Sequence, residues 1–255
     1  MMTTSYELPR GDAFHAGTFV KTTSAQTIEI LGGCGLDFAV LDAEHAPFDR
    51  AAIDLAMIAG RASGLPLFVR VPDRSAAGLL SVLDMGAAGV LVPHVESAEH
   101  AREVVAHCRY VGGDRGYSSS PRAAGYGALG MKGAIAEGDR NVVICQIESA
   151  PAVEQAQRIA AVAGVGGIFI GRADLALSMG LDDAQHPRVF EATEHVIRAG
   201  LAAGSTVGMF VGSTAEREKY LALGVRWFVQ GSDQSLLRQG AQAIARSNSS
   251  RTLQA

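Results

Sequence analysis

The chain has 255 residues, of which 48% are hydrophobic and only 19% are charged, so it can fill a large core and is not a disordered protein. Its 22 Lys and Arg against 26 Asp and Glu give a net charge of −4, without a basic face or an acidic run. Nucleic acid and anionic membranes are therefore not expected partners, and a small-molecule ligand is the default.

Eight short apolar runs recur along the chain, and each is followed by a stretch with helical spacing. Most are apolar throughout rather than alternating, which is typical of parallel strands covered on both faces. The predicted strands are Gly17–Val20, Leu36–Asp42, Pro66–Val71, Ala88–Pro93, Asn141–Glu148, Gly166–Gly171, Ser205–Val211 and Val225–Gln230.

Helix boundary signals lie between these runs. Capping-box spacing is found at Thr23 with Gln26 and at Ser213 with Glu216, while Asp49 and Ser97 can cap alone. Glycines that suit left-handed helix ends stand at positions 64, 86, 204 and 224. Eight strand–helix units without a linker favour a single-domain (β/α)8 barrel over residues 1–255, with 1–12 and 247–255 frayed. An open, doubly wound sheet is the alternative.

The segment 112–127, GGDRGYSSSPRAAGYG, departs from this rhythm because it is long, polar and rich in glycine. Such a connection in a compact barrel is usually functional or mobile. Arg115 and Arg122 offer planar donors for a carboxylate, which favours a functional loop.

Three cysteines, Cys34, Cys108 and Cys145, form no C-x-x-C pair and are expected to be free thiols that pack as small apolar residues. The N-terminal residues lack the pattern of a secretion signal, and no run approaches the ~20 apolar residues of a membrane span. These features predict a cytoplasmic protein.

In a parallel barrel the site forms at the carboxyl ends of the strands, so the polar residues that end the runs are the candidates. The second run ends in Asp42, Glu44 and His45, the third in Arg70, and the fourth in Pro93 and His94. The fifth ends in Gln146 and Glu148, and the sixth leads to Asp174.

Glu148 and Asp174 follow neighbouring strands, which pair at ~4.8 Å, so both carboxylates can reach one ion. Without a cation the two would repel each other. Carboxylates with water and substrate oxygens suit Mg²⁺ or Mn²⁺ better than zinc. The structural alternative is that both residues only cap helices.

Arg70 closes a buried strand and must meet an anion, either a substrate carboxylate or a structural salt bridge. His45 can act as a general base near neutral pH or be a bystander. A metal, a cation and a base together support enolate chemistry beside a carbonyl. Lys21, near the first strand end, raises a Schiff-base alternative, which the carboxylate pair makes unnecessary.

Several segments resemble the HpcH/HpaI aldolase family of metal-dependent class II pyruvate aldolases, whose members include 4-hydroxy-2-oxoheptanedioate aldolase and 2-dehydro-3-deoxyglucarate aldolase. The resemblance runs in order from about Gly17 to the GSDQSLL segment, nearly the whole chain. It is specific because D-x-E-H, Q-x-E and G-x-A-D stand at matching strand ends. The segments are GTFVKTTSAQTIEILGGCGLDFAVLDAEHAPFD, FVRV, LLSVLDMGAAGVLVPHVES, VICQIES and IFIGRADLALSMG.

The resemblance implies a lyase that cleaves a 4-hydroxy-2-oxo acid to pyruvate and an aldehyde, and catalyses the reverse addition, through a pyruvate enolate held at the metal. It implies Mg²⁺ or Mn²⁺, with Co²⁺ as a further candidate. The implied roles are metal ligands for Glu148 and Asp174, substrate and enolate binding for Arg70, base for His45, and substrate contacts for Gln146, Ala173 and Asp174.

The resemblance also implies that Asp84 raises the basicity of His45. Asp84 lies near the end of the helix after the third strand, at the opposite end of its own barrel. The conflict disappears if Asp84 serves a neighbouring subunit in the hexamer, a trimer of dimers with exchanged C-terminal helices, that the resemblance implies.

Two residues depart from the family pattern: Phe19 stands where Trp is frequent, and Arg172 replaces a proline. Arg172 lies beside a metal ligand and could change which second carboxylate or phosphate is accepted. Two rival functions remain open. One is a related barrel lyase acting on a CoA thioester, and the other is a non-catalytic sugar-acid-binding protein on the same scaffold.

Overall fold

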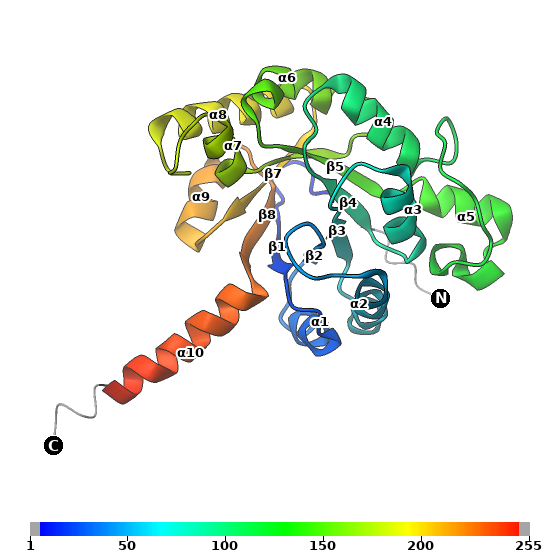
Figure 1. Ribbon diagram of the computed structural model, residues 1–255, viewed down its shortest axis with the longest axis horizontal. Coiled ribbons are helices and arrows are strands. Elements are labelled where there is room, and N and C mark those ends of the chain that lie inside the picture. The colour runs from blue at the N-terminus through cyan, green and yellow to red at the C-terminus, as the bar shows by residue number, and fades with distance from the viewer. Residues whose placement is uncertain (1–5, 250–255) are drawn as a thin grey trace.

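The computed structural model describes residues 6–249, and within that range eight parallel strands pair in chain order, with β8 closing on β1 (Figure 1). The predicted closed (β/α)8 barrel is therefore confirmed. All eight strands overlap the predicted runs, although β1 begins two residues earlier and β8 ends two residues later than predicted. The strands are β1 His15–Val20, β2 Phe38–Asp42, β3 Leu67–Arg70, β4 Gly89–Val92, β5 Val142–Ile147, β6 Gly167–Ile170, β7 Thr206–Val211 and β8 Trp227–Ser232.

Helices follow the strands and surround the barrel, apart from the last helix. They are α1 Ala25–Gly32, α2 Arg50–Ser63, α3 Ala76–Asp84, α4 Ala98–Cys108, the 3-10 helix η1 Arg122–Gly127, α5 Gly130–Gly138, α6 Ala150–Ala160, α7 Arg172–Ser178, α8 Pro187–Ala202, α9 Thr214–Ala222 and α10 Asp233–Ser249.

The helix boundaries agree with the predicted caps at most positions. The side chains of Asp49, Ser97 and Ser213 each accept a backbone hydrogen bond in the first turn of their helices. The cap predicted at Thr23 is wrong, because α1 begins after Ser24, whose hydroxyl donates to the side chain of Gln26 instead of capping the backbone.

Two apolar clusters hold the barrel together. One lies between the sheet and the helices, and the other fills the interior. Because side chains alternate along a strand, every second residue points inward. The interior positions carry large aromatic residues near the amino ends of the strands, where Phe38 stacks on Trp227 with ring centroids 4.1 Å apart. This layer makes the lower barrel a packed core.

Part of the N-terminal segment, whose residues 1–12 were predicted to be frayed, covers this lower end. Tyr6 and Leu8 pack against the interior cluster. The Tyr6 hydroxyl accepts a hydrogen bond from Trp227 Nε1 at 2.9 Å and lies 2.7 Å from His15 Nδ1. The frayed tail predicted from 247 is helical as far as Ser249, and the rest of both predicted segments lies outside the described residues.

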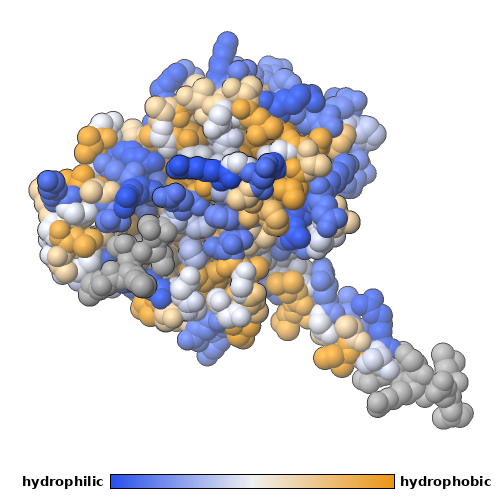
Figure 2. Space-filling model, turned by 180° about the vertical axis from the view of Figure 1, so that it is seen from behind, coloured by the Kyte–Doolittle hydropathy of each residue, from blue (hydrophilic) through white to orange (hydrophobic). Residues whose placement is uncertain are grey.

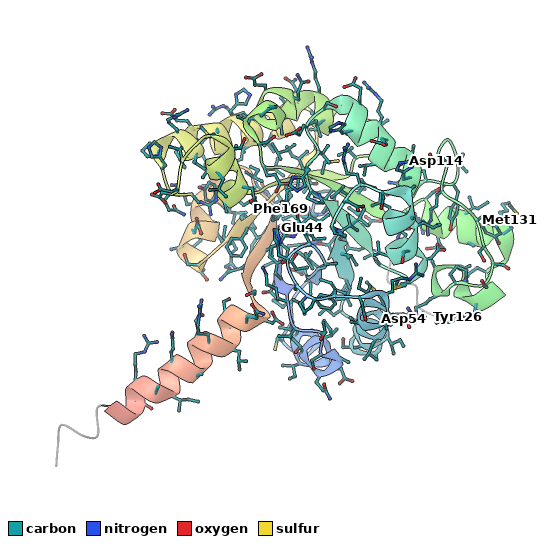
Figure 3. The ribbon with its side chains drawn as sticks, in the orientation of Figure 1. Glu44, Asp54, Asp114, Tyr126, Met131 and Phe169 are labelled. Atoms are coloured by element: carbon teal, nitrogen blue, oxygen red, sulfur yellow. The ribbon has the colours of Figure 1, made fainter. Side chains whose placement is uncertain are left out.

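The loop predicted to be functional, 112–127, uses its arginines for structure instead. Arg115 is buried and binds Asp84 at 3.0 Å, while Arg122 binds Asp54 and the carbonyl oxygen of Met85, both at 2.7 Å. Asp84 and Met85 end α3, below the amino end of β4. The loop therefore lies away from the carboxyl rim, and its residues Asp114 and Tyr126 stand at the periphery in Figure 3, far from Glu44.

The last helix, α10, leaves the barrel rather than packing beside α9 and α1 (Figure 1). Figure 2 shows it as an arm with apolar patches that projects from the globular body. Its side chains of Leu236, Leu237 and Ile244 are 46%, 74% and 67% exposed. Such apolar exposure on a projecting helix is typical of a surface that another element covers.

The cysteines are free, as predicted. Cys108 and Cys145 are buried as predicted, and burial raises the pKa of their thiols to about 11 and about 12. The packing predicted for Cys34 is wrong, because this residue is exposed. A catalytic thiolate at either buried position is thus disfavoured. None of the helices within residues 6–249 has the length and apolar character needed to cross a membrane.

The contacts of Tyr6 predict a measurable loss of stability on removal of its hydroxyl. Tyr6→Phe leaves the buried Trp227 Nε1 without an acceptor and should lower the free energy of unfolding by about 1–2 kcal/mol in urea denaturation. Tyr117→Phe is the matched control, since Tyr117 is 36% exposed, and should change it by less than about 0.5 kcal/mol. Equal stability of Tyr6→Phe and the wild type would show that the segment does not close the barrel.

Candidate active site

The inward-facing positions change from apolar to polar at the carboxyl rim of the barrel. On β2 the interior residues Phe38 and Val40 are followed, two residues on, by Asp42. On β3 Phe68 is followed by Arg70, and on β5 Ile144 is followed by Gln146 and then Glu148. The alternation that builds the core therefore also aims these polar side chains at one mouth.

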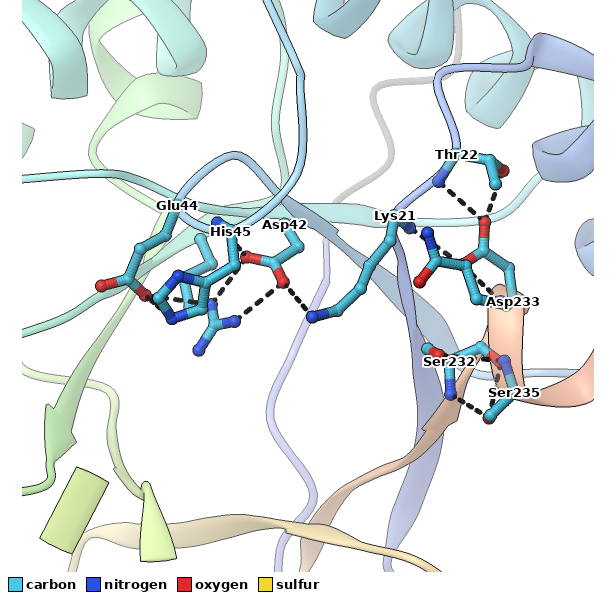
Figure 4. Close-up of polar contacts among 10 residues, drawn as sticks. Lys21, Thr22, Asp42, Glu44, His45, Ser232, Asp233 and Ser235 are labelled. Atoms are coloured by element: carbon cyan, nitrogen blue, oxygen red, sulfur yellow. Dashed lines mark hydrogen bonds and ion pairs between the residues drawn. The ribbon is translucent and has the colours of Figure 1, made fainter. Parts of the chain in front are cut away.

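Asp42 is the centre of the charge arrangement at this mouth (Figure 4). Its carboxylate is fully buried, accepts from Arg70 Nε at 3.0 Å and Nη2 at 2.8 Å, and lies 2.9 Å from Lys21 Nζ. Asp42 and Arg70 are register partners on β2 and β3, so strand pairing itself holds this bidentate pair. Burial alone would raise the pKa of Asp42, but Arg70 and Lys21 outweigh it and lower the pKa.

Asp42 fixes the position of Arg70 but does not occupy all of its hydrogen-bond donors. Its guanidinium carbon lies 4.6 Å from the centre of the Phe19 ring, and its Nε is 3.3 Å from Glu44. Within residues 6–249 its Nη1 has no hydrogen-bond partner, and the side chain lines the cavity at the mouth. The predicted salt bridge and the predicted anion-binding edge therefore coexist in one residue.

Lys21 binds Asp42 through its ammonium group, and Asp233 anchors the same turn by accepting from the backbone N–H groups of Lys21 and Thr22. The nitrogen that would have to attack a carbonyl is thus already engaged in an ion pair. This arrangement disfavours the Schiff-base alternative.

Glu148 is 4% exposed and lies just above the end of β5. It accepts from the backbone N–H of His94 at 2.7 Å and from the side-chain amide of Gln146. The amide oxygen of Gln146 is itself buried and has no partner among the described residues. Gly171 permits this position, because a Cβ there would stand 3.0 Å from Glu148 Cβ. Asp174 lies in the first turn of α7, directly after the neighbouring strand β6.

Sequence reasoning did not assign roles to Glu44 and His94, although both were named at strand ends. Glu44 Oε1 lies 3.4 Å from His94 Nε2, and His94 Nδ1 lies 3.1 Å from Glu148 Oε1. Burial raises the pKa of Glu44, against the lowering effect of Arg70, and the charge of Glu148 raises it further. Their position in the sequence could have indicated a role, because Glu44 and His94 each follow a strand whose neighbouring strands carry candidate residues.

A cavity of about 560 Å³ opens above these residues. His45, Arg70, Gln146, Ala173 and Asp174 line it, so the structure brings five of the predicted site residues to one space. Glu148 lies beside it, in contact with Gln146. The His45 side chain is 52% exposed and its Nε2 is 3.6 Å from Glu44. This volume suits a small oxo acid with its aldehyde portion.

The charges at the mouth fit a divalent cation. The side chains of Asp42, Glu44 and Glu148 form a contact network with Lys21, Arg70 and His94, which we call the mouth network. Asp174 adds a fourth carboxylate against two cations, so with neutral histidines the formal charge is two negative. Oxygen-rich sites of this kind suit Mg²⁺ or Mn²⁺. Within residues 6–249 no three His, Cys, Asp or Glu side chains are grouped so that they could hold a metal ion by themselves.

Asp84 and Arg172 behave differently from the other candidates. Asp84 lies at the opposite end of its own barrel, as predicted, in its ion pair with Arg115. Arg172 lines the cavity, but its guanidinium binds Glu216 at 2.6 Å, Tyr220 Oη at 3.2 Å and a backbone carbonyl. Arg172 therefore shapes the wall of the cavity with most of its donors already engaged.

The family model described as HpcH/HpaI aldolase/citrate lyase matches residues 15–240. The 5-keto-4-deoxy-D-glucarate aldolase of Salmonella arizonae is 37% identical over 90% of this chain and 90% of its own length.

Two crystal structures agree in fold and sequence. A HpcH/HpaI aldolase/citrate lyase family protein from Burkholderia cenocepacia has a TM-score of 0.89 and 35% identity, covering 93% of this chain and 96% of its own. A HpcH/HpaI aldolase from Desulfitobacterium hafniense has a TM-score of 0.87 and 27% identity, covering 92% and 93%.

The buried pair predicts a pH-dependent stability change. Asp42→Asn removes the charge that balances Arg70 and Lys21 and should cost about 3 kcal/mol at pH 7. Because the pKa of Asp42 is lowered on folding, its contribution is complete above the ordinary value of 3.8 and is lost as pH falls through the lower folded value. The stability difference between wild type and variant should therefore narrow on acidification.

Urea denaturation at a series of pH values measures this difference. Glu194→Gln is the control, since Glu194 makes a surface pair with Arg198 at 3.4 Å and should matter by less than about 0.5 kcal/mol. A difference between wild type and Asp42→Asn that is independent of pH would contradict the assignment of charge to Asp42.

Proposed function

The chain belongs to the HpcH/HpaI aldolase/citrate lyase family and is an aldolase, and we propose that it cleaves a 4-hydroxy-2-oxo acid into pyruvate and an aldehyde with the help of a divalent metal ion. The same site would catalyse the reverse addition. One observation carries the proposal: Arg70 and Asp174 line one cavity large enough for such a substrate, and Arg70 is in contact with the further carboxylates of Asp42 and Glu44.

Glu148 and Asp174 would hold the ion, Mg²⁺ or Mn²⁺ with Co²⁺ as a further candidate. A divalent cation there polarises the 2-oxo group and stabilises the negative charge that develops when the carbon–carbon bond breaks. Among the described residues the buried amide oxygen of Gln146 has no hydrogen-bond partner, and Glu148 packs closely against Gly171. Both features support a site that holds oxygen ligands in fixed positions.

Arg70 would bind the carboxylate and enolate oxygens of the substrate through its free edge. Asp42 fixes the plane of the guanidinium, so little conformational entropy is lost on binding. Gln146 and the backbone at Ala173 line the same cavity and would complete the contacts to the oxo acid. Preorganised donors of this kind stabilise the charge that develops at the reacting oxygen.

His45 would take the proton from the 4-hydroxyl group. As the O–H electrons form the aldehyde carbonyl, the C3–C4 bond breaks and its electron pair becomes the enolate of pyruvate, which is then protonated at carbon. The exposed position of His45 at the cavity edge allows proton exchange with water.

Asp84 would assist His45 only across a subunit boundary, because its own barrel holds it at the far end. We propose a hexamer built as a trimer of dimers, in which α10 crosses to a neighbouring subunit. The projecting helix with its exposed Leu237 and Ile244 supports this exchange. The free thiols support the cytoplasmic location expected from the sequence.

The names of similar aldolases indicate a narrower class of substrate. The aldolase of Salmonella arizonae is named for 5-keto-4-deoxy-D-glucarate, a sugar diacid, and we propose a related sugar acid for this chain. The CoA alternative loses its support, since Arg115 and Arg122 are engaged by Asp84 and Asp54. The non-catalytic alternative requires a site that binds a sugar acid without turnover.

Pyruvate release from 4-hydroxy-2-oxo acids tests the reaction. Purified enzyme should release pyruvate, lose activity in excess EDTA and regain it with Mg²⁺ or Mn²⁺. Glu148→Gln removes a charged ligand and should lower kcat/KM by roughly 10²-fold or more. Full activity of the protein in EDTA would refute the metal, and tight binding of a sugar acid without pyruvate release would favour the non-catalytic alternative.

Mixing two inactive variants tests the role of Asp84. If Asp84 acts in the site of a neighbouring subunit, Asp84→Ala and His45→Ala should each have low aldolase activity alone. Mixed oligomers, formed by dissociating and reassembling the two variants together, should regain part of that activity. Sites that combine an intact His45 with an intact Asp84 from another subunit account for the recovery. If the activity of the mixture equals the average of the two variants, then Asp84 of one subunit does not act in the site of another.

A further inference from the structure

The candidate cavity contains a cation that the proposed reaction does not yet use. Among residues 6–249, three Lys or Arg side chains line the cavity, namely Lys21, Arg70 and Arg172. Arg172 is engaged by Glu216, a tyrosine hydroxyl and a backbone carbonyl, and Arg70 donates to Asp42 through Nε and Nη2. The free edge of Arg70 would bind the oxo-acid half of the substrate. Lys21 is therefore the cation that remains for a second anionic group.

Lys21 is fixed at two points before any ligand binds. Its backbone N–H donates to Asp233 Oδ1 at 2.9 Å, and its Nζ lies 2.9 Å from Asp42 Oδ2 (Figure 4). The side chain lines the cavity and is 28% exposed, so a ligand in the cavity can reach it. Because the residue is already ordered, little conformational entropy is lost when the ammonium group takes a further partner.

The ammonium group of Lys21 has unused donors. It carries three N–H groups, and within the part of the chain that the structure describes Asp42 is its one acidic partner. Asp233, the other carboxylate at this turn, accepts instead from the backbone N–H groups of Lys21 and Thr22. An incoming carboxylate can thus bind Lys21 without displacing an acid of the protein.

Asp42 does not neutralise Lys21 completely. The same carboxylate accepts two hydrogen bonds from Arg70, so one negative charge is shared between two positive groups. Glu44, 3.3 Å from Arg70 Nε, offsets part of the charge of Arg70 rather than that of Lys21. Because the remaining positive charge of Lys21 faces a cavity, it favours an anion there.

We propose that Lys21 binds the carboxylate on the aldehyde half of the substrate, so that the enzyme prefers diacids to monoacids. The inference rests on the aldolase reaction proposed above and narrows its substrate class. Lys21 Nζ and Arg70 Nη2 both contact Asp42 Oδ2, at 2.9 and 2.8 Å, so one small diacid can reach both cations. The oxo-acid half binds at Arg70 and the second carboxylate at Lys21, with the carbon–carbon bond that breaks between them.

Aldol addition of pyruvate to two matched aldehydes tests the inference in the Mg²⁺-loaded enzyme. The aldehydes are 2-hydroxy-3-oxopropanoate and glyceraldehyde, which has a hydroxymethyl group in place of the carboxylate. The wild type should prefer the acid. Lys21→Met should lower kcat/KM for the acid by roughly 10- to 100-fold and for glyceraldehyde by less than about threefold, because only the acid loses a charged hydrogen bond. A loss transmitted through Asp42 and Arg70 would instead affect both aldehydes equally, since both reactions use the same pyruvate.

Two further variants serve as controls. Lys21→Arg keeps the positive charge and should retain most of the preference for the acid. Lys132→Met removes an exposed lysine of α5 and should leave kcat/KM for both aldehydes unchanged.

Chemical protection of the wild type gives a readout that needs neither a variant nor turnover. 2-Oxoglutarate has a carboxylate where 2-oxopentanoate has a methyl group, and neither has the 4-hydroxyl group that cleavage requires. Lysines are acetylated with acetic anhydride and quantified by mass spectrometry. 2-Oxoglutarate should slow the acetylation of Lys21 severalfold and 2-oxopentanoate should not, while the exposed Lys132 and Lys219 should react at the same rate throughout.

Equal losses for the two aldehydes in Lys21→Met would overturn the inference, and so would a rate of Lys21 acetylation that the two oxo acids change equally. If the wild type forms no product with either aldehyde, the proposed reaction is refuted. The protection experiment then still decides whether Lys21 binds a second carboxylate.

Discussion

The excess of negative charge at the carboxyl rim of the barrel determines how the residues of this site are arranged. Strand pairing sets Asp42 beside Arg70, and His94 lies between Glu44 and Glu148. Arg70 and Lys21 offset only part of the negative charge of these three carboxylates. Charged groups leave water at a high cost unless they are paired or bind a metal. A rim that retains such an excess is therefore arranged for a cation, and the remaining features of the site extend this arrangement.

The lower end of the barrel stabilises the fold, and the upper end carries the candidate active site. At the lower end Tyr6, Phe38 and Trp227 close the interior with stacked rings and a buried hydrogen bond. At the upper end the same inward positions carry Asp42 and Arg70, which hold each other in a fixed plane. A rigid lower core lets the rim maintain a charged, strained arrangement that would be costly in an isolated loop.

The sequence was sufficient for the fold because each strand is a short apolar run and each run is bounded by turn residues. It also located the site, since parallel strand ends meet at one rim. It failed where a side chain has two possible partners. Arg115 and Arg122 looked free for a ligand, yet their partners are Asp84 and Asp54, far away in sequence.

Two further misses have the same physical origin. Tyr6 seemed part of a loose end because its partner Trp227 is distant along the chain, and such contacts leave no local pattern. The contacts of His94 were not predicted because they depend on a left-handed backbone and on two carboxylates that follow other strands. Periodicity predicts which face a residue occupies but not which of several charged neighbours it will bind.

Anomalous diffraction from crystals grown with Mn²⁺ and pyruvate would show where the protein binds the ion. We expect one strong manganese peak at the carboxyl rim, within bonding distance of Glu148 and Asp174, with the pyruvate carboxylate against the free edge of Arg70. Manganese bound elsewhere on the protein, with these two carboxylates turned apart, would contradict the proposed metal site.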